Sequence, residues 1–249
     1  MKNIVYIVAH PDDESLWVGG TISALNKSEH YNVYVLCLWG LLEAPDEHRE
    51  ESFYKATADC KKSYIFVRGS HMGDHPIDDG LKRMGLLPSE VDLIITHPPY
   101  GDEHQHPHHK IAYHESTTWS SQHGVPIGNF SFFAMPFTYK QVALHAKRLD
   151  GLHLLNLFQV TNTHANEKYK FWPKYFLQFL VDIESRNKML ENYHSIDASQ
   201  HKDGYFGWTS NCEGYYLDEA GLEVMNDLIE SMPTPTNSES LYSKYDHGI

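Results

Sequence analysis

A short apolar run that ends in a cluster of polar side chains is the feature that most limits how this chain folds. Residues 4–8 read Ile-Val-Tyr-Ile-Val, and a β-branched run of this kind is typical of a strand buried within a parallel sheet. The next six residues, 9–14, read Ala-His-Pro-Asp-Asp-Glu, so an imidazole and three carboxylates follow the strand directly. Ligands of open α/β sheets bind outside the carboxyl ends of the strands. The sequence therefore predicts a reactive site at the end of the first strand.

Strand-like and helix-like segments alternate through the first half of the chain. We expect strands at residues 3–9, 33–38, 65–67 and 91–96, and helices at residues 20–28 and 46–61. Such alternation is typical of βαβ units. It predicts an α/β, Rossmann-like fold whose mostly parallel sheet is flanked by helices, with the site at the C-terminal edge of the strands.

The second half of the chain has a weaker pattern. Residues 130–137 and 152–160 resemble strands, whereas residues 139–149 and 167–193 resemble helices. Clustered Gly, Pro and Asp predict a long loop with one helical turn at residues 69–90, and residues 233–249 resemble a loosely held tail. Because no linker or internal repeat is visible, we expect residues 1–249 to form a single domain.

Charge and composition argue against several classes of partner. The chain carries 33 acidic and 20 basic residues, and its formal net charge of −13 disfavours binding to nucleic acid or to an anionic membrane. Three scattered cysteines are too few for a disulfide framework, which favours a reducing compartment. No apolar run has the length of a membrane span or a signal peptide. We therefore expect a cytoplasmic protein, and a homo-oligomer remains open.

Histidines crowd into one segment behind the fourth expected strand. The chain has 18 histidines, and residues 97–114 contain His97, His104, His106, His108, His109 and His114. Parallel strands end at the same edge of a sheet, so this segment is expected to lie near His10. A catalytic zinc ion typically takes three nitrogen or oxygen ligands from the protein. His10 and Asp13 can supply two ligands from one loop, and a later histidine can supply the third.

Two motifs together resemble the signatures of the PIG-L/LmbE-like de-N-acetylase family. Residues 9–14, followed by Gly19-Gly20-Thr21, resemble the first signature, and His106-Pro107-His108-His109 resembles the later His-Pro-Asp-His element. Arg49-Glu50-Glu51, the strand at 91–96 and Cys212-Glu213-Gly214-Tyr215 agree with the family in order. The resemblance is specific across residues 3–115 and weak beyond them.

The resemblance implies a role for each matching residue. His10, Asp13 and His109 match metal ligands, Asp12 matches the general base, and His106 matches the histidine that stabilises charge or protonates the leaving amine. Family members remove the acyl group from N-acetylglucosamine-type amides, usually with zinc and in some members with ferrous iron. The resemblance thus implies Zn²⁺, or Fe²⁺ or another divalent ion, and a small-molecule N-acetylated sugar or glycoside as substrate.

The residue types agree with this chemistry. A bound divalent ion lowers the pKa of its water towards ~7 and polarises a carbonyl, and a neighbouring carboxylate accepts the remaining proton. Successive side chains of an extended segment point in opposite directions, so adjacent Asp12 and Asp13 suit one base and one ligand. His106 in its charged form is expected to donate a hydrogen bond to the developing oxyanion.

Two positions depart from the family's pattern. His108 stands where members usually carry Asp, and His104 stands where many carry Tyr as an oxyanion donor. We expect His104 to act as the donor in place of Tyr, and Asp102 or Glu103 can replace the missing carboxylate.

Three further residues are candidates for binding the substrate. Arg49 can reach a sugar hydroxyl or phosphate, or pair with an acidic neighbour on its own helix. Trp17 can form a pocket wall, and Asp74 can bind a sugar hydroxyl or serve a turn.

The sequence thus predicts a zinc-dependent N-deacetylase, an amide hydrolase that removes the acetyl group from an amino sugar or amino-sugar conjugate with Asp12 as general base. Two alternatives stay open. One is an amidase that uses the same metal on a non-sugar or thiol conjugate. The other is a metal-binding module without catalysis, which His104 and His108 keep open.

Overall fold

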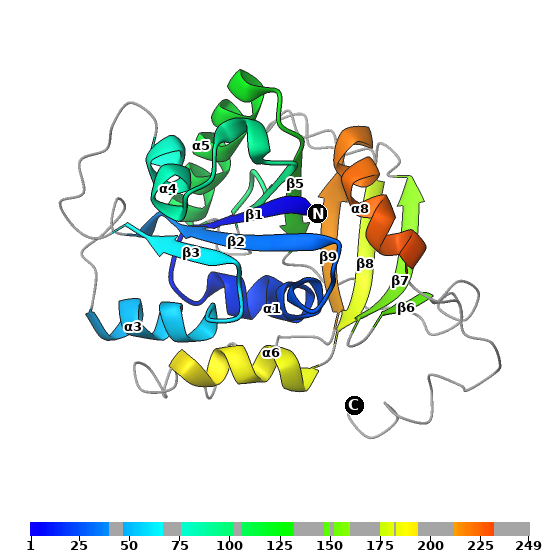
Figure 1. The fold of residues 1–249 in the computed structure, drawn as a ribbon, viewed down its shortest axis with the longest axis horizontal. Coiled ribbons are helices and arrows are strands. Elements are labelled where there is room, and N and C mark those ends of the chain that lie inside the picture. The colour runs from blue at the N-terminus through cyan, green and yellow to red at the C-terminus, as the bar shows by residue number, and fades with distance from the viewer. Residues whose placement is uncertain are drawn as a thin grey trace.

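One mixed sheet organises the fold in this computed structural model. The structure describes residues 1–39, 47–66, 76–101, 106–131, 147–149, 152–159, 175–181, 183–193 and 212–231. Within these residues, nine strands pair in the order β3-β2-β1-β4-β5-β9-β8-β7-β6 (Figure 1). The sheet therefore runs from the N-terminal half of the chain into the C-terminal half.

The N-terminal half of the sheet is parallel. It consists of β1 (Lys2–Val8), β2 (Tyr31–Cys37), β3 (Lys62–Ile65), β4 (Leu93–Thr96) and β5 (Ile127–Ser131). Strand β1 pairs with β2 and with β4, β2 pairs with β3, and β4 pairs with β5, all in parallel. The predicted Rossmann-like α/β fold is confirmed, and the carboxyl ends of β1 and β4 lie side by side.

Helices cover both faces of the sheet (Figure 1). They are α1 (Asp13–Asn26), α3 (Glu47–Ala56), α4 (Pro76–Met84), α5 (Pro107–His123), α6 (Ile183–Leu190) and α8 (Glu219–Ser231), with short 3₁₀ turns η1 (Pro88–Glu90) and η4 (Glu191–Tyr193). Alternate residues of β1 enter opposite core clusters, as a strand's period of two requires. Tyr6 packs in the cluster that includes residues of α1, α3 and α6, whereas Ile7 packs in the cluster that includes residues of α4 and α5.

Four antiparallel strands extend the sheet beyond β5. They are β9 (Cys212–Leu217), β8 (Tyr175–Val181), β7 (Leu152–Gln159) and β6 (Lys147–Leu149), and each pairs antiparallel with its neighbour. The strand predicted at 152–160 is confirmed by β7. The helix predicted at 167–193 is wrong over β8 and right over α6, and the helix predicted at 139–149 is wrong over β6. The apolar run of β8 is short, and the periodicity of a short apolar run does not distinguish a strand from a helix. This explains the wrong prediction.

A nine-residue helix replaces part of the loop predicted at residues 69–90. Helix α4 buries Ile77, Leu81 and Met84, which follow the i, i+4, i+7 spacing of one helical face. Pro76 occupies its first turn, and Gly85 follows its end with a φ of 74°. Residues 69–75 lie outside the described residues.

Helix α5 was not anticipated by the sequence analysis, which treated residues 97–114 as a histidine-rich segment. Pro107 is its first residue, and Gly124 ends it in the left-handed conformation with a φ of 67°. A Pro at the start and a Gly just past the end are the usual signals of helix termini. The expected tail at 233–249 lies outside the described residues, and the single domain stays a prediction.

A buried carboxylate ties the C-terminal strands to the helix that carries Asp13. Glu213 of β9 is 3% exposed, and its oxygens accept hydrogen bonds from the Gly20 N–H (2.8 Å), the Thr21 N–H (2.8 Å) and the Thr21 hydroxyl (2.6 Å). Helix α1 also passes close to β8, because a Cβ added at Gly20 would lie 2.4 Å from the Val181 Cβ. Close packing thus explains Gly20 of the Gly-Gly-Thr motif, and the hydrogen bonds to Glu213 explain Thr21.

Replacing Glu213 by Gln is expected to destabilise the protein. The amide keeps the size of the side chain but turns one acceptor into a donor, so it leaves at least one buried donor without its acceptor, at a cost of about 1–3 kcal/mol. Urea unfolding measures this as a lower midpoint. Glu223→Gln, at an exposed position of α8, is the matched control and keeps the wild-type midpoint. Equal midpoints for the two variants would contradict the role of Glu213.

Candidate metal centre

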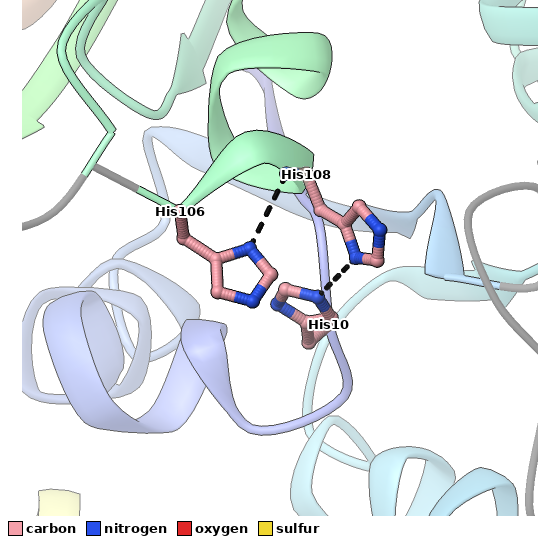
Figure 2. Close-up of side chains that lie close together, drawn as sticks. All are labelled: His10, His106 and His108. Atoms are coloured by element: carbon pink, nitrogen blue, oxygen red, sulfur yellow. Dashed lines mark hydrogen bonds between the residues drawn. The ribbon is translucent and has the colours of Figure 1, made fainter. Parts of the chain in front are cut away.

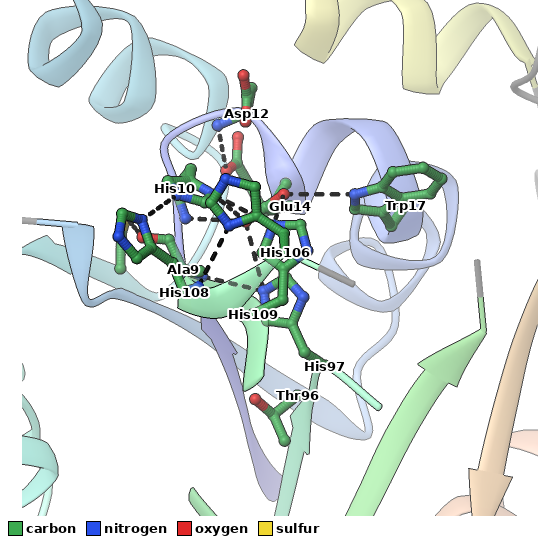
Figure 3. A network of polar contacts seen from close by, with 12 residues as sticks. Ala9, His10, Asp12, Glu14, Trp17, Thr96, His97, His106, His108 and His109 are labelled. Carbon is green, nitrogen blue, oxygen red and sulfur yellow. Dashed lines mark hydrogen bonds and ion pairs between the residues drawn. The ribbon is translucent and has the colours of Figure 1, made fainter. Parts of the chain in front are cut away.

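The predicted residues of both motifs lie together in the structure (Figure 3). They lie at the carboxyl ends of β1 and β4 and in the first turns of α1 and α5. His10 follows β1, Asp13 begins α1, and His109 lies in the first turn of α5. All three are buried, with exposed fractions of 9%, 3% and 4%. Parallel pairing of β1 with β4 explains why residues 96 positions apart in sequence meet here.

Donor atoms of these three side chains converge. His10 Nδ1 lies 3.2 Å from His109 Nε2 and 3.4 Å from Asp13 Oδ2, and His109 Nε2 lies 3.4 Å from Asp13 Oδ1. Ligand atoms bonded at about 2.0–2.1 Å to a tetrahedral zinc ion lie roughly 3.3 Å apart. Two imidazole nitrogens and one carboxylate are also a usual protein donor set for catalytic zinc. The donors therefore fit a divalent ion in both type and spacing.

The Asp13 carboxylate is held from several directions. Its Oδ2 accepts a hydrogen bond from the His10 N–H (2.8 Å), and its Oδ1 accepts one from the Trp17 indole N–H (3.3 Å). Burial alone would raise the pKa of Asp13, but the neighbouring His109, together with the contact to His10, keeps that pKa well below its usual range. Trp17, predicted as a pocket wall for the substrate, thus contacts the carboxylate, while its predicted role in substrate binding stays a prediction.

His97 lies beneath this group at the end of β4. Its ring is fully buried and stacks on His109, with centroids 4.2 Å apart and an angle of 18° between the planes. Its Nε2 accepts a hydrogen bond from the Ala9 N–H (3.0 Å), which requires the ring hydrogen to be on Nδ1. Burial lowers the pKa of His97 to about 3, so the ring is neutral. Its position directly after a strand is the signal in the sequence that favours such a buried, hydrogen-bonding role over that of a ligand.

Asp12 and Asp13 point apart because the backbone turns sharply between them. Asp12 has a φ of 134°, which a residue with a Cβ rarely adopts. Its carboxylate accepts a hydrogen bond from Arg49 Nη2 (2.9 Å), and the same guanidinium contacts the Pro11 carbonyl (3.0 Å). Burial raises the pKa of Asp12 to about 6, against the opposing charge of Arg49. Arg49 therefore pairs with the predicted base, a partner that sequence analysis did not indicate.

Glu14 forms a second buried carboxylate beside Asp12. Its Oε1 accepts hydrogen bonds from the Tyr193 hydroxyl (2.6 Å) and the Ser15 hydroxyl (2.7 Å), and its Oε2 accepts one from the Asp12 N–H (3.2 Å). Burial raises the pKa of Glu14 to about 7. Tyr193 was missed from the sequence because it is 179 residues away and follows no recognisable motif.

His106 caps the helix that carries His109. Its Nδ1 accepts a hydrogen bond from the His108 N–H (3.2 Å) at the start of α5. This bond uses the Nδ1 lone pair, so the ring is neutral with its hydrogen on Nε2. The positive end of the helix dipole also disfavours a charged ring. The cap contact thus favours a neutral donor over the charged His106 that the sequence analysis expects.

Some predicted residues cannot be placed. His104 and Asp74 lie outside the described residues, as do Asp102 and Glu103. His108, which replaces the family's Asp, is described, and its Nδ1 lies 2.9 Å from His10 Nε2.

Comparison with known proteins adds evidence for the fold. No protein-family model and no curated protein sequence matches the chain. Among solved structures, the A40926 pseudoaglycone deacetylase Dbv21 matches with a TM-score of 0.51 at 15% identity, over 86% of this chain and 96% of its own. A deacetylase of teicoplanin biosynthesis matches with a TM-score of 0.52 at 12% identity, over 86% and 97%. The zinc-inhibited form of the teicoplanin deacetylase Orf2 matches with a TM-score of 0.51 at 13% identity, over 86% and 97%.

These likenesses agree with the resemblance of the sequence motifs, and at such low identities they show the fold. The chain has the PIG-L/LmbE-like deacetylase fold. Within this PIG-L/LmbE-like fold, the two motifs that carry the resemblance meet at the same edge of the sheet. In the described part of the chain, no helix has the length and apolar character needed to cross a bilayer.

Replacing Trp17 by Phe is expected to weaken metal binding. The variant keeps an aromatic ring but removes the hydrogen bond to Asp13, and loss of such supporting contacts typically costs about 10–100-fold in affinity. Competition with a chromophoric chelator measures the change. Trp119→Phe is the matched control, because it removes an indole hydrogen bond to Asp78 on α4, outside the group of donors. Equal affinity in Trp17→Phe and wild type would contradict support of Asp13 by Trp17.

Proposed function

We propose that this chain is a metal-dependent N-deacetylase that hydrolyses the acetamide of an amino sugar or amino-sugar conjugate. One observation carries the proposal. Two imidazoles and a carboxylate from distant motifs converge at 3.2–3.4 Å, and a second carboxylate, that of Asp12, turns away from them beside the group. The deacetylases that share the fold act, by their descriptions, on the A40926 pseudoaglycone or in teicoplanin biosynthesis, which favours a glycoside substrate.

His10, Asp13 and His109 would hold the ion. When bound, a divalent ion supplies a positive charge that polarises the amide carbonyl and makes water acidic near neutral pH. Nitrogen and oxygen donors of this kind suit zinc and also accept ferrous iron. We assign zinc as the resident ion, with Fe²⁺ as the alternative.

Asp12 serves as the general base. It takes a proton from the attacking water and delivers it to the amide nitrogen as the C–N bond breaks, which yields acetate and a free amine. A base works best when its pKa lies near the working pH, and burial places the pKa of Asp12 at about 6. The hydrogen bond from Arg49 fixes the direction of the carboxylate.

His106 supplies a hydrogen bond to the carbonyl oxygen. Its Nδ1 accepts the hydrogen bond of the helix cap, so Nε2 is the nitrogen that carries the hydrogen. A donor that is already fixed in place stabilises the charge that develops on the oxygen without further rearrangement. His106 thereby acts as a neutral donor.

Replacing Asp12 by Asn tests the assignment of the base. The variant is expected to keep the ion, because Asp12 is not among the three donors, and to lose about 10²–10⁴-fold in turnover. Elemental analysis gives the metal content, and amine release from an N-acetylglucosamine conjugate gives the turnover.

Two controls define the outcome. Asp13→Asn removes a donor and is expected to lose the ion held by His10, Asp13 and His109, and with it the activity. Asp59→Asn, at an exposed position, is expected to change neither. Wild-type turnover in Asp12→Asn would show that another group is the base.

A substrate screen separates the proposed activity from its alternatives. The zinc-loaded protein is expected to release amine from N-acetylated amino sugars or their glycosides at least about 10-fold faster than from N-acyl amino acids or thiol conjugates, because sites that hydrogen-bond a substrate reject analogues without those groups. The reverse preference would favour the amidase. Bound metal without release of amine from any compound would favour the non-catalytic module.

A further inference from the structure

A second group of three histidines lies beside the first metal centre. It consists of His10, His106 and His108, whose potential ligand atoms lie within 4.8 Å of one another (Figure 2). His106 and His108 come from the start of α5 and are half-buried, whereas His10 is 9% exposed. The group therefore lies on the outer side of the first centre, where an ion from solution can reach it.

His10 faces both groups with different ring nitrogens. Its Nδ1 lies among the donors of the first centre, 3.2 Å from His109 Nε2. Its Nε2 lies 2.9 Å from His108 Nδ1. Once its ring hydrogen has passed to solvent, this imidazolate can bind an ion on each side.

His106 completes the second group. Its Nδ1 accepts the His108 N–H, so Nε2 binds an ion only after the ring hydrogen moves from Nε2 to Nδ1 and that hydrogen bond breaks. The His106 ring centroid lies 4.7 Å from that of His10 and 5.0 Å from that of His108. The three rings therefore surround one small volume.

We propose that His10, His106 and His108 form a second metal site, which takes an imidazole-preferring ion such as Zn²⁺, Ni²⁺ or Cu²⁺, with His10 as the ligand shared by both sites. Three imidazoles suit these metals better than they suit Mg²⁺ or Ca²⁺, which prefer oxygen ligands. The inference rests on the proposed function only in that the first of the two ions is bound by His10, Asp13 and His109. It does not require the protein to be catalytically active.

The chemistry of the 2.9 Å contact supports this site. Two ring nitrogens at that distance share one hydrogen between their lone pairs. A metal cation takes the place of that hydrogen, which passes to solvent, as happens when imidazoles bind metals. His108 stands where members of the resembling family usually carry Asp. The site with three imidazole ligands therefore depends on this departure from the family's pattern.

Occupation of the second site has a consequence for the first. The second ion takes His106 Nε2, the atom proposed to donate to the substrate's carbonyl oxygen. The second ion also binds the His10 ring, which already holds the first ion. Repulsion between the two cations lowers the affinity for the second ion by about tenfold or more. The site therefore acts as an inhibitory site that fills only when metal is in excess.

Zinc binding to the metal-free protein tests the proposal by its stoichiometry. Isothermal titration and equilibrium dialysis are expected to show two ions in wild type, a tighter and a weaker one. His108→Ala and His108→Gln are each expected to bind only the tighter ion. Circular dichroism checks that both variants fold, and the exposed His114→Ala on the same helix is the matched control that keeps both ions.

Asp13→Asn separates this proposal from the proposed function. It is expected to lose the tighter ion and to keep the ion bound by the three histidines. One ion in wild type, or two ions in both His108 variants, would overturn the second site. Two ions in wild type and one in each His108 variant, without release of amine from any substrate, would support the second site while the proposed function fails.

Discussion

The Asp13 carboxylate is the group on which the rest of the site depends. It begins α1 at the end of β1, and it lies within 3.4 Å of ring nitrogens of His10, His97 and His109. A buried carboxylate is costly unless it is neutralised and hydrogen-bonded. The surrounding rings and the two N–H donors meet that cost in the structure, and a divalent ion would meet it more fully. The same contacts fix the direction of each ligand, so the stability of the loop and the geometry of the site have one origin.

Separation of the two adjacent aspartates is the second constraint. The positive φ of Asp12 costs about 1–3 kcal/mol for a residue of this kind, and such strain persists only where neighbours enforce it. Arg49 on one side and the donors around Asp13 on the other provide that enforcement. The Asp13 carboxylate is thereby directed towards the proposed ion, and the Asp12 carboxylate is directed away from it, as a base requires. His10 belongs both to this group and to the second group, with His106 and His108.

The parallel half of the fold was predictable because its strands and helices alternate and because β1, β2 and β4 each contain a continuous apolar run. The donors His10, Asp13 and His109 were predictable because they fall in two motifs behind neighbouring strands. The contacts of Arg49, Tyr193 and Glu213 were not, since they join residues 37, 179 and more than 190 positions apart, and sequence pattern carries no distance of that kind. Strand β8 was mistaken for helix because a short apolar run, interrupted by Gln178, fits both periods.

The whole site requires that His10, Asp13 and His109 bind the same ion. Anomalous diffraction from crystals of the protein loaded with one equivalent of Zn²⁺ locates that ion. We expect a zinc peak bonded at about 2.0–2.2 Å to a nitrogen of His10, a nitrogen of His109 and an oxygen of Asp13. A peak that lies elsewhere, or a bound zinc that leaves Asp13 uncoordinated, would contradict it.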